Sequence, residues 1–225
     1  MKINIEQVHQ RIAMAAQKCG KQPDEITLIA VSKTMPPEAV ERAISLGLTD
    51  FGENYIQEGI EKANTFRTTG IWHFIGHLQS NKAKLAVEHF NMIQSVDSID
   101  LINKINTLSA NSNKKMDILL EIHYGDEASK TGFSMQEIEQ AVPLISSLQN
   151  INIKGLMTIP PLVNNPEDNR KYFKAMRKLG QQIFGSQKHI LSMGMTDDFE
   201  IAIEEGSNMV RIGRAIFGER AKREN

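Results

Sequence analysis

A lysine at the end of an apolar run is the first residue whose setting suggests chemistry. Lys33 directly follows the run Ile26–Ser32. Burying an ammonium group costs free energy, and desolvation favours the neutral amine, which can attack a carbonyl. Lys33 therefore has the setting of a Schiff-base lysine. On this feature alone, a lysine that reaches from a strand end into solvent is the alternative.

Two turns near the C-terminus give the second chemical signal. The segments are Leu191–Thr196, which reads LSMGMT, and Met209–Gly218, which reads MVRIGRAIFG. A glycine followed by a helical turn lets backbone N–H groups approach a phosphate closely. These turns favour a phosphate site, although an ordinary tight turn is the alternative for either one alone.

The elements that must position these residues alternate along the chain. Ile5, Val8 and Ile12 recur at helical spacing and predict an N-terminal helix. Short apolar runs then alternate with helical patterns, which predicts parallel βαβ units. The predicted strands are Ile26–Ser32, Asp50–Gly52, Ile71–Ile75, Met92–Val96, Asp117–Ile122, Ile151–Met157, Ile190–Met193 and Met209–Ile212. The predicted helices between them are Pro37–Ser45, Tyr55–Phe66, Ser80–His89, Ile99–Ala110, Met135–Leu148, Glu167–Phe184 and Asp198–Glu205.

Eight predicted strands in 225 residues indicate an α/β protein with a (β/α)₈ TIM barrel, one domain over residues 1–225, and an extra N-terminal helix. No G-x-G-x-x-G motif, typical of an open dinucleotide-binding sheet, follows the first predicted strand. In a barrel, functional residues lie at the C-terminal strand ends, and a phosphate site commonly follows strands seven and eight. Lys33 and the two turns then share one face. Pyridoxal 5′-phosphate (PLP) carries both groups that such a face would bind, an aldehyde that reacts with amines and a phosphate.

Composition narrows the class of protein. The formal net charge is −1, so nothing in it suggests nucleic acid or an anionic membrane as a partner, and the short basic tail Arg220–Arg223 is interpreted as a solvated end. Cys19 is the single cysteine, which fits a reducing compartment. Neither a signal peptide nor an apolar run of about 20 residues is present. We expect a soluble cytoplasmic protein.

Other polar groupings give weaker signals. His73 and His77 would share one face of an extended strand, so a metal pair is conceivable. Acidic or thiol ligands at suitable spacing are lacking, so we expect no metal, with one histidine packed and the other at the barrel mouth. The segment Asp126–Lys130 is interpreted as a mutually paired surface loop, with a lip over the cofactor as the alternative. Lys130 as a second position for PLP is a further alternative.

Several motifs, in order along nearly the whole chain, resemble the pyridoxal phosphate homeostasis protein family, whose fold matches the N-terminal barrel of alanine racemase. The segments are Ala30–Thr34 (AVSKT), Phe51–Tyr55 (FGENY), Trp72–Lys82 (WHFIGHLQSNK), Ser95–Ser98 (SVDS), Ser129–Gly132 (SKTG), Gly155–Pro160 (GLMTIP), Leu191–Asp198 (LSMGMTDD) and Val210–Gly218 (VRIGRAIFG).

The resemblance implies a role for individual residues. Lys33 would carry PLP as a Schiff base, and Arg211 would face the pyridine nitrogen. The remaining implied cofactor contacts are Asn54 in the pocket, Ser192 with the backbone of Gly213 and Arg214 at the phosphate, and Met157, Met193 and Thr196 as wall residues. One position departs from the family: Met35 stands where relatives commonly carry a second lysine, which puts any role of that lysine in transferring PLP in doubt here.

The resemblance also bears on catalysis. The guanidinium of an arginine only donates hydrogen bonds and leaves the pyridine nitrogen unprotonated, so Arg211 would weaken the ring as an electron sink. Alanine racemase shares this arginine but adds a tyrosine base from a separate C-terminal domain, which we do not expect after Asn225. We therefore predict a monomeric PLP carrier rather than an enzyme, with apo PLP-dependent enzymes as recipients. The alternatives are a low-activity amino-acid racemase and a Schiff-base aldolase acting on a sugar phosphate.

Overall fold

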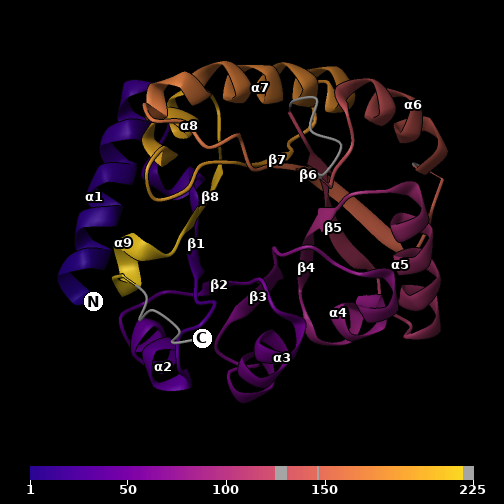
Figure 1. Ribbon diagram of the computed structural model, residues 1–225, viewed down its shortest axis with the longest axis horizontal. Helices are drawn as coiled ribbons and strands as arrows, with labels where there is room; N and C mark the ends of the chain where they lie inside the picture. The colour runs from indigo at the N-terminus through magenta and orange to yellow at the C-terminus, as the bar shows by residue number, and fades with distance from the viewer. Residues whose placement is uncertain (125–130, 146, 220–225) are drawn as a thin grey trace.

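Eight parallel strands close into a barrel in chain order, with β8 paired to β1. The computed structural model describes residues 1–124, 131–145 and 147–219. Helices surround the barrel on the outside (Figure 1). The (β/α)₈ barrel with an extra N-terminal helix is therefore confirmed. Lys130, the rest of Gly125–Lys130 and the tail Arg220–Asn225 lie outside the described residues.

The strands and helices follow the predicted order. The strands are β1 Thr27–Val31, β2 Asp50–Glu53, β3 Ile71–Phe74, β4 Met92–Val96, β5 Met116–Ile122, β6 Ile151–Thr158, β7 Ile190–Ser192 and β8 Met209–Ile212. The helices are α1 Lys2–Lys18, α2 Pro37–Ser45, α3 Ile56–Thr65, α4 Ala83–His89, α5 Ile99–Asn111, α6 Met135–Ile145, α7 Arg170–Phe184, α8 Phe199–Glu204 and α9 Arg214–Phe217.

The predicted bounds differ from the observed ones mainly at helix starts. The helix expected over Ser80–His89 begins with a 3₁₀ turn, Ser80–Lys82, before α4. The helix expected over Glu167–Phe184 likewise begins with a 3₁₀ turn, Pro166–Asn169, before α7. Such tighter turns are common at helix N-termini and leave little signal in the apolar spacing.

The sheet is buried on both faces, as parallel sheets are. Ile29, Met92, Leu119, Met157 and Met209 form a buried cluster of their own on the strands. A larger core lies between the strands and the helices, and the buried face of α1 joins it through Ile5, Val8 and Ile12. Figure 1 shows α1 beside α8 and α9, where it covers the seam between the last and first strands.

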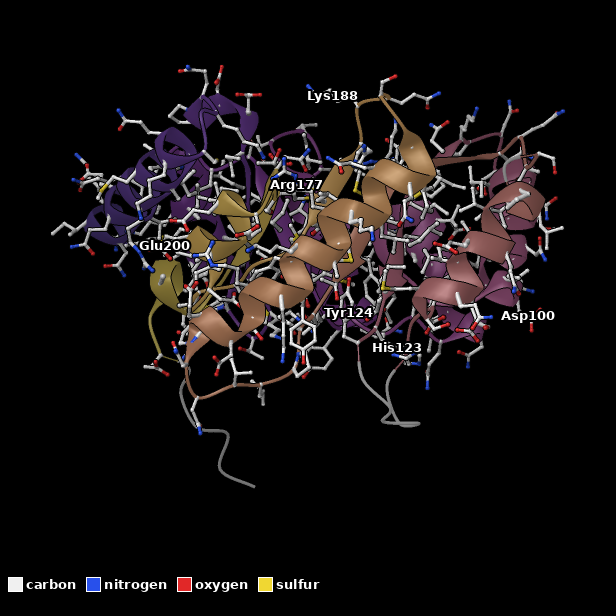
Figure 2. The ribbon with its side chains drawn as sticks, turned by 90° about the horizontal axis from the view of Figure 1, so that it is seen from above. Asp100, His123, Tyr124, Arg177, Lys188 and Glu200 are labelled. Atoms are coloured by element: carbon white, nitrogen blue, oxygen red, sulfur yellow. The ribbon has the colours of Figure 1, made fainter. Side chains whose placement is uncertain are left out.

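The two ends of the barrel carry different residues. Figure 2 shows His123 and Tyr124, which follow β5, toward one end of the molecule, and Lys188, which precedes β7, toward the other. We call the end at the C-terminal strand ends the mouth and the opposite end the base. Within the described ranges, no helix is both long and apolar enough to cross a membrane.

Candidate functional site

The turn after β1 holds Lys33 at the mouth in an unusual backbone conformation. Thr34 has φ of 67°, in the left-handed region that few non-glycine residues adopt. The Met35 N–H closes the turn on the Ser32 carbonyl at 2.9 Å. The Thr34 N–H donates to Glu58 on α3 at 2.5 Å. The backbone on both sides of Lys33 is therefore fixed by hydrogen bonds at Ser32 and Thr34.

A buried ion cluster lies behind this turn. The Lys62 ammonium donates to the Ser32 carbonyl at 2.7 Å, to Glu53 at 2.9 Å and to Glu58 at 2.7 Å. The Lys62 side chain is 3% exposed and the Glu53 side chain 0%. Burial raises the pKa of Glu53, and the charge of Lys62 opposes that shift. Lys62 thus links the end of β1, the end of β2 and the first turn of α3 beside Lys33.

Arg211 points into the barrel from β8 and is 3% exposed. Its Nη1 donates to the Ser192 carbonyl at 2.7 Å and to the Ser192 hydroxyl at 2.6 Å, and its Nη2 donates to the Thr158 carbonyl at 2.8 Å. A guanidinium has five N–H donors. Three are used, so the Nε–H and one Nη2–H have no acceptor among the described residues. Burial lowers the pKa of Arg211 to about 10, which leaves it charged at neutral pH.

Ser192 lies deeper inside the barrel than is expected for a residue that contacts a phosphate at the mouth. Its hydroxyl is fully buried, accepts from Arg211 and donates to Gln94 Oε1 at 2.7 Å. The structure therefore brings Ser192 and Arg211 together directly. The direct phosphate contact implied for Ser192 stays a prediction.

The turn after β8 passes close to the end of β1. A Cβ on Gly213 would lie 3.2 Å from the Val31 carbonyl oxygen, so the chain approaches here because glycine has no side chain. Gly213 also caps α9, and the first N–H groups of a helix have no partner within it. Arg214 supplies one of those N–H groups, while its exposed side chain pairs with Asp197. Gly213 therefore lies beside the end of β1, two residues before Lys33.

Polar atoms without partners collect at the mouth. Asn54, after β2, has a buried Oδ1 with no hydrogen bond among the described residues. The same holds for Thr34 Oγ1, His123 Nδ1 and the Tyr124 hydroxyl. Figure 2 shows that His123 and Tyr124 lie at the same end. A buried polar group left unpaired costs about 1–3 kcal/mol, so each of these atoms would gain from a polar partner.

Two polar residues on the inner face of the barrel, the partly exposed Glu121 and the buried Gln94, were missed by the sequence reasoning. Glu121 follows Leu119 on the inner face of β5, and burial, with a smaller contribution from Asp97, raises its pKa to about 7 while Arg211 opposes the shift. Gln94 is fully buried on β4. The one sequence signal that could have found them is the alternation of strand residues between the two faces of the sheet. Gln94 and Glu121 each lie two residues after a residue of the inner cluster, Met92 and Leu119, and so share its face.

The predicted division between the two histidines is confirmed. His73 is packed inside the barrel at 3% exposure, whereas His77 follows β3 with a side chain 55% exposed, 3.3 Å from Asp97. In the described part of the chain, no group of three or more His, Cys, Asp or Glu could hold a metal ion. Among the predicted wall residues, Met157 belongs to the inner cluster, but Met193 packs in the outer core and Thr196 is partly exposed.

Comparison with known proteins gives a consistent result. The family described as alanine racemase, N-terminal domain, matches residues 3–221. The pyridoxal phosphate homeostasis protein of Escherichia coli is 40% identical over 227 residues, which cover 96% of this chain and 95% of that protein. The protein of the same name from Vibrio alginolyticus is 41% identical over 224 residues, 96% of each.

Solved structures agree. The PLP-bound structure of PipY from Synechococcus elongatus is 34% identical, with a TM-score of 0.80 over 92% of this chain and 100% of that chain. The alanine racemase from E. faecalis is 18% identical, with a TM-score of 0.68 over 94% of this chain and 58% of that chain, a likeness of fold alone.

Proposed function

The chain belongs to the pyridoxal phosphate homeostasis protein family, and from that premise we propose that it binds PLP at the barrel mouth and holds it for delivery. Lys33 would carry the cofactor as a Schiff base. The backbone of Gly213 and Arg214 would hold the phosphate, Arg211 would face the pyridine nitrogen, and Ser192 would join the site through Arg211. The observation that carries the proposal is the unused donor edge of the buried Arg211.

The residues at the mouth fit this group. An unprotonated pyridine nitrogen is an acceptor and matches the free Nε–H and Nη2–H of Arg211. Asn54 Oδ1, after β2, is buried and unpaired within the described residues, so a polar ligand would satisfy it. When bound, PLP supplies an aldehyde that bonds to an amine and a ring that withdraws electrons.

Carriage fits this arrangement better than catalysis. A carboxylate at the pyridine nitrogen would hold a proton there and strengthen electron withdrawal, whereas Arg211 keeps its own proton at neutral pH and only donates a hydrogen bond to the nitrogen. We propose one domain over residues 1–225 that works as a monomer in the cytoplasm and passes PLP to apo PLP-dependent enzymes. Nothing in the net charge of −1 favours a nucleic-acid partner.

The test is cofactor identification on the whole protein. Purified protein is incubated with PLP, reduced with borohydride and digested, and the modified peptide is identified by mass. We expect one phosphopyridoxyl group on Lys33. Protein that takes up no PLP would overturn the proposal. Protein that instead traps a sugar phosphate aldehyde or ketone on Lys33 would replace it with the aldolase alternative.

A low-activity racemase is the second candidate, and Glu121 is the observation that favours it. Its pKa of about 7 suits a group that gives and takes protons at neutral pH. The two candidates differ in α-proton exchange of L-alanine with deuterated solvent, followed by NMR at full PLP occupancy. We expect little exchange. Rapid exchange that disappears in Glu121→Gln would establish the racemase and assign its acid/base residue.

A further inference from the structure

A line of buried polar side chains crosses the interior of the barrel from Arg211 to the base. The Ser192 hydroxyl lies 2.6 Å from Arg211 Nη1 and 2.7 Å from Gln94 Oε1. Gln94 Nε2 lies 3.1 Å from His73 Nδ1, and His73 Nε2 lies 3.1 Å from Asp50 Oδ1. Arg211, Ser192, Gln94 and His73 are at most 3% exposed. Asp50, the first residue of β2, is partly exposed at the base.

Arg211 at one end of this line can only donate hydrogen bonds, and Asp50 at the other end can only accept them. These two constraints determine which atom donates in each bond between them. Arginine only donates, so the Ser192 oxygen accepts from Arg211 and gives its one proton to Gln94 Oε1. The Gln94 amide nitrogen then faces His73. Met209 supports this orientation because its sulfur, which can only accept, lies 3.3 Å from the same nitrogen.

The last bond follows from the same rule. Because Gln94 Nε2 donates to His73 Nδ1, that ring nitrogen carries no proton, and His73 is the neutral tautomer protonated at Nε2. Its Nε2–H donates to the Asp50 carboxylate, which only accepts. Burial alone would raise the pKa of Asp50, but hydrogen bonds from His73 and Thr49 bring it below its ordinary value. Every bond therefore points from Arg211 toward Asp50.

We propose that Ser192, Gln94, His73 and Asp50 are positioning residues that act as one relay, which orients the Arg211 guanidinium toward the pyridine nitrogen. The part that concerns the pyridine nitrogen rests on the proposed function, and the direction of the relay does not. Hydrogen bonds aligned in one direction polarise and strengthen one another inside a protein. The relay also joins a buried cation to a carboxylate at the opposite end of the barrel. It keeps two Arg211 donors inside the barrel and leaves the Nε edge for the cofactor.

The first experiment needs no cofactor. Long-range ¹H–¹⁵N NMR of the PLP-free protein at pH 7.5 reports which nitrogen of His73 carries the proton. We expect Nε2 protonated and Nδ1 unprotonated. A His73 protonated at Nδ1, or at both nitrogens, would overturn the relay whatever the protein binds.

The second experiment reads the far end of the relay with PLP labelled by ¹⁵N at the pyridine nitrogen. Arg211→Lys sets the reference shift, because it keeps the charge and loses the planar fork. Gln94→Leu interrupts the relay, and we expect the pyridine ¹⁵N signal to move in the same direction by a smaller amount. Met209→Leu is the matched control: it touches the same amide nitrogen outside the relay and should leave the signal unchanged.

The outcomes separate the relay from the proposed function. If Arg211→Lys leaves the pyridine signal in place, Arg211 does not face the ring and that part of the proposed function fails. If Arg211→Lys moves the signal and Gln94→Leu does not, the relay is overturned while the proposed function stands. Should Gln94→Leu not fold, Asp50→Asn at the partly exposed base replaces it. Its amide still accepts from His73 but carries no charge, so a smaller shift in the same direction is expected, and none would overturn the relay.

Discussion

The mouth and the base of the barrel differ in how fully their polar groups are paired by hydrogen bonds. At the base, side chains close the loops before the strands: Lys21 donates to the carbonyls of Gly206 and Ser207, and Lys114 to those of Val87 and Phe90. Asparagines do the same for backbone N–H groups, with Asn91 accepting from Trp72, Asn208 from Leu191 and Asn106 from Asn150. At the mouth, the buried polar atoms without partners among the described residues include Thr34 Oγ1, Glu53 Oε2, Asn54 Oδ1, His123 Nδ1 and the Tyr124 hydroxyl.

This difference in hydrogen bonding between the two ends indicates which end of the barrel binds a ligand. Satisfied polar groups at the base stabilise the barrel, although the buried Trp72 indole N–H and the buried Ser109 hydroxyl near that end are also unpaired in the described part of the chain. At the mouth, a buried Asn54 oxygen without a partner among the described residues carries a free-energy cost that a polar partner would remove. The division agrees with the general separation of stability and function between the two ends of TIM barrels.

The largest effect is expected for Lys33→Ala at the mouth, compared with Lys21→Ala at the base. Removing Lys33 should abolish covalent attachment of PLP and leave the fold intact, because this side chain fills no core volume. Lys21→Ala should keep full attachment and unfold at lower urea, since two carbonyls lose a donor. Borohydride trapping with peptide mass mapping measures attachment. A stoichiometric adduct in Lys33→Ala would make another lysine the main site.

The next effect concerns the ion cluster behind the Lys33 turn. Lys62→Met should lower the free energy of unfolding by about 3–5 kcal/mol, because the buried Glu53 carboxylate loses its counter-charge. Lys18→Met is the matched control: Lys18 pairs with Glu204 at 3.0 Å, but its side chain is 65% exposed, so about 0–1 kcal/mol is expected. Urea unfolding measures both, and equal losses would mean that burial of the cluster contributes little.

Glu121 should make stability depend on pH in a defined direction. Its pKa is raised from 4.5 to about 7, so the folded state holds this proton more tightly than the unfolded state. The stabilisation is fully present below pH 4.5 and is lost as pH rises through 7. The loss is on the order of 3 kcal/mol. Urea unfolding at pH 5 and pH 8 should show it in the wild type and not in Glu121→Gln; identical pH slopes would place Glu121 in contact with water.

The order of strands and the position of Lys33 could be predicted from sequence because both depend on local apolar spacing. The inner polar residues could not. Gln94 and Glu121 lie on strands, where a polar side chain ordinarily marks a solvent-facing position, and only closure of the barrel turns that face inward. Lys62 lies on an amphipathic helix, where lysine ordinarily indicates the exposed face. Its burial depends on Glu53 and on the Ser32 carbonyl, two groups that come from other elements.

The smallest effect decides between two roles for Ser192. Ser192→Ala should weaken PLP binding by about 0.5–1.5 kcal/mol, the contribution of one hydrogen bond. Pyridoxal, which lacks the phosphate, separates the roles. A hydroxyl on the phosphate predicts a loss for PLP alone, as the resemblance of the sequence implies. A hydroxyl that holds Arg211 predicts the same loss for both ligands, because both share the pyridine nitrogen. The observed bonds from Arg211 and to Gln94 favour the shared loss. Fluorescence titration of wild type and Ser192→Ala with each ligand measures it, and a loss confined to PLP would move Ser192 from the relay to the phosphate.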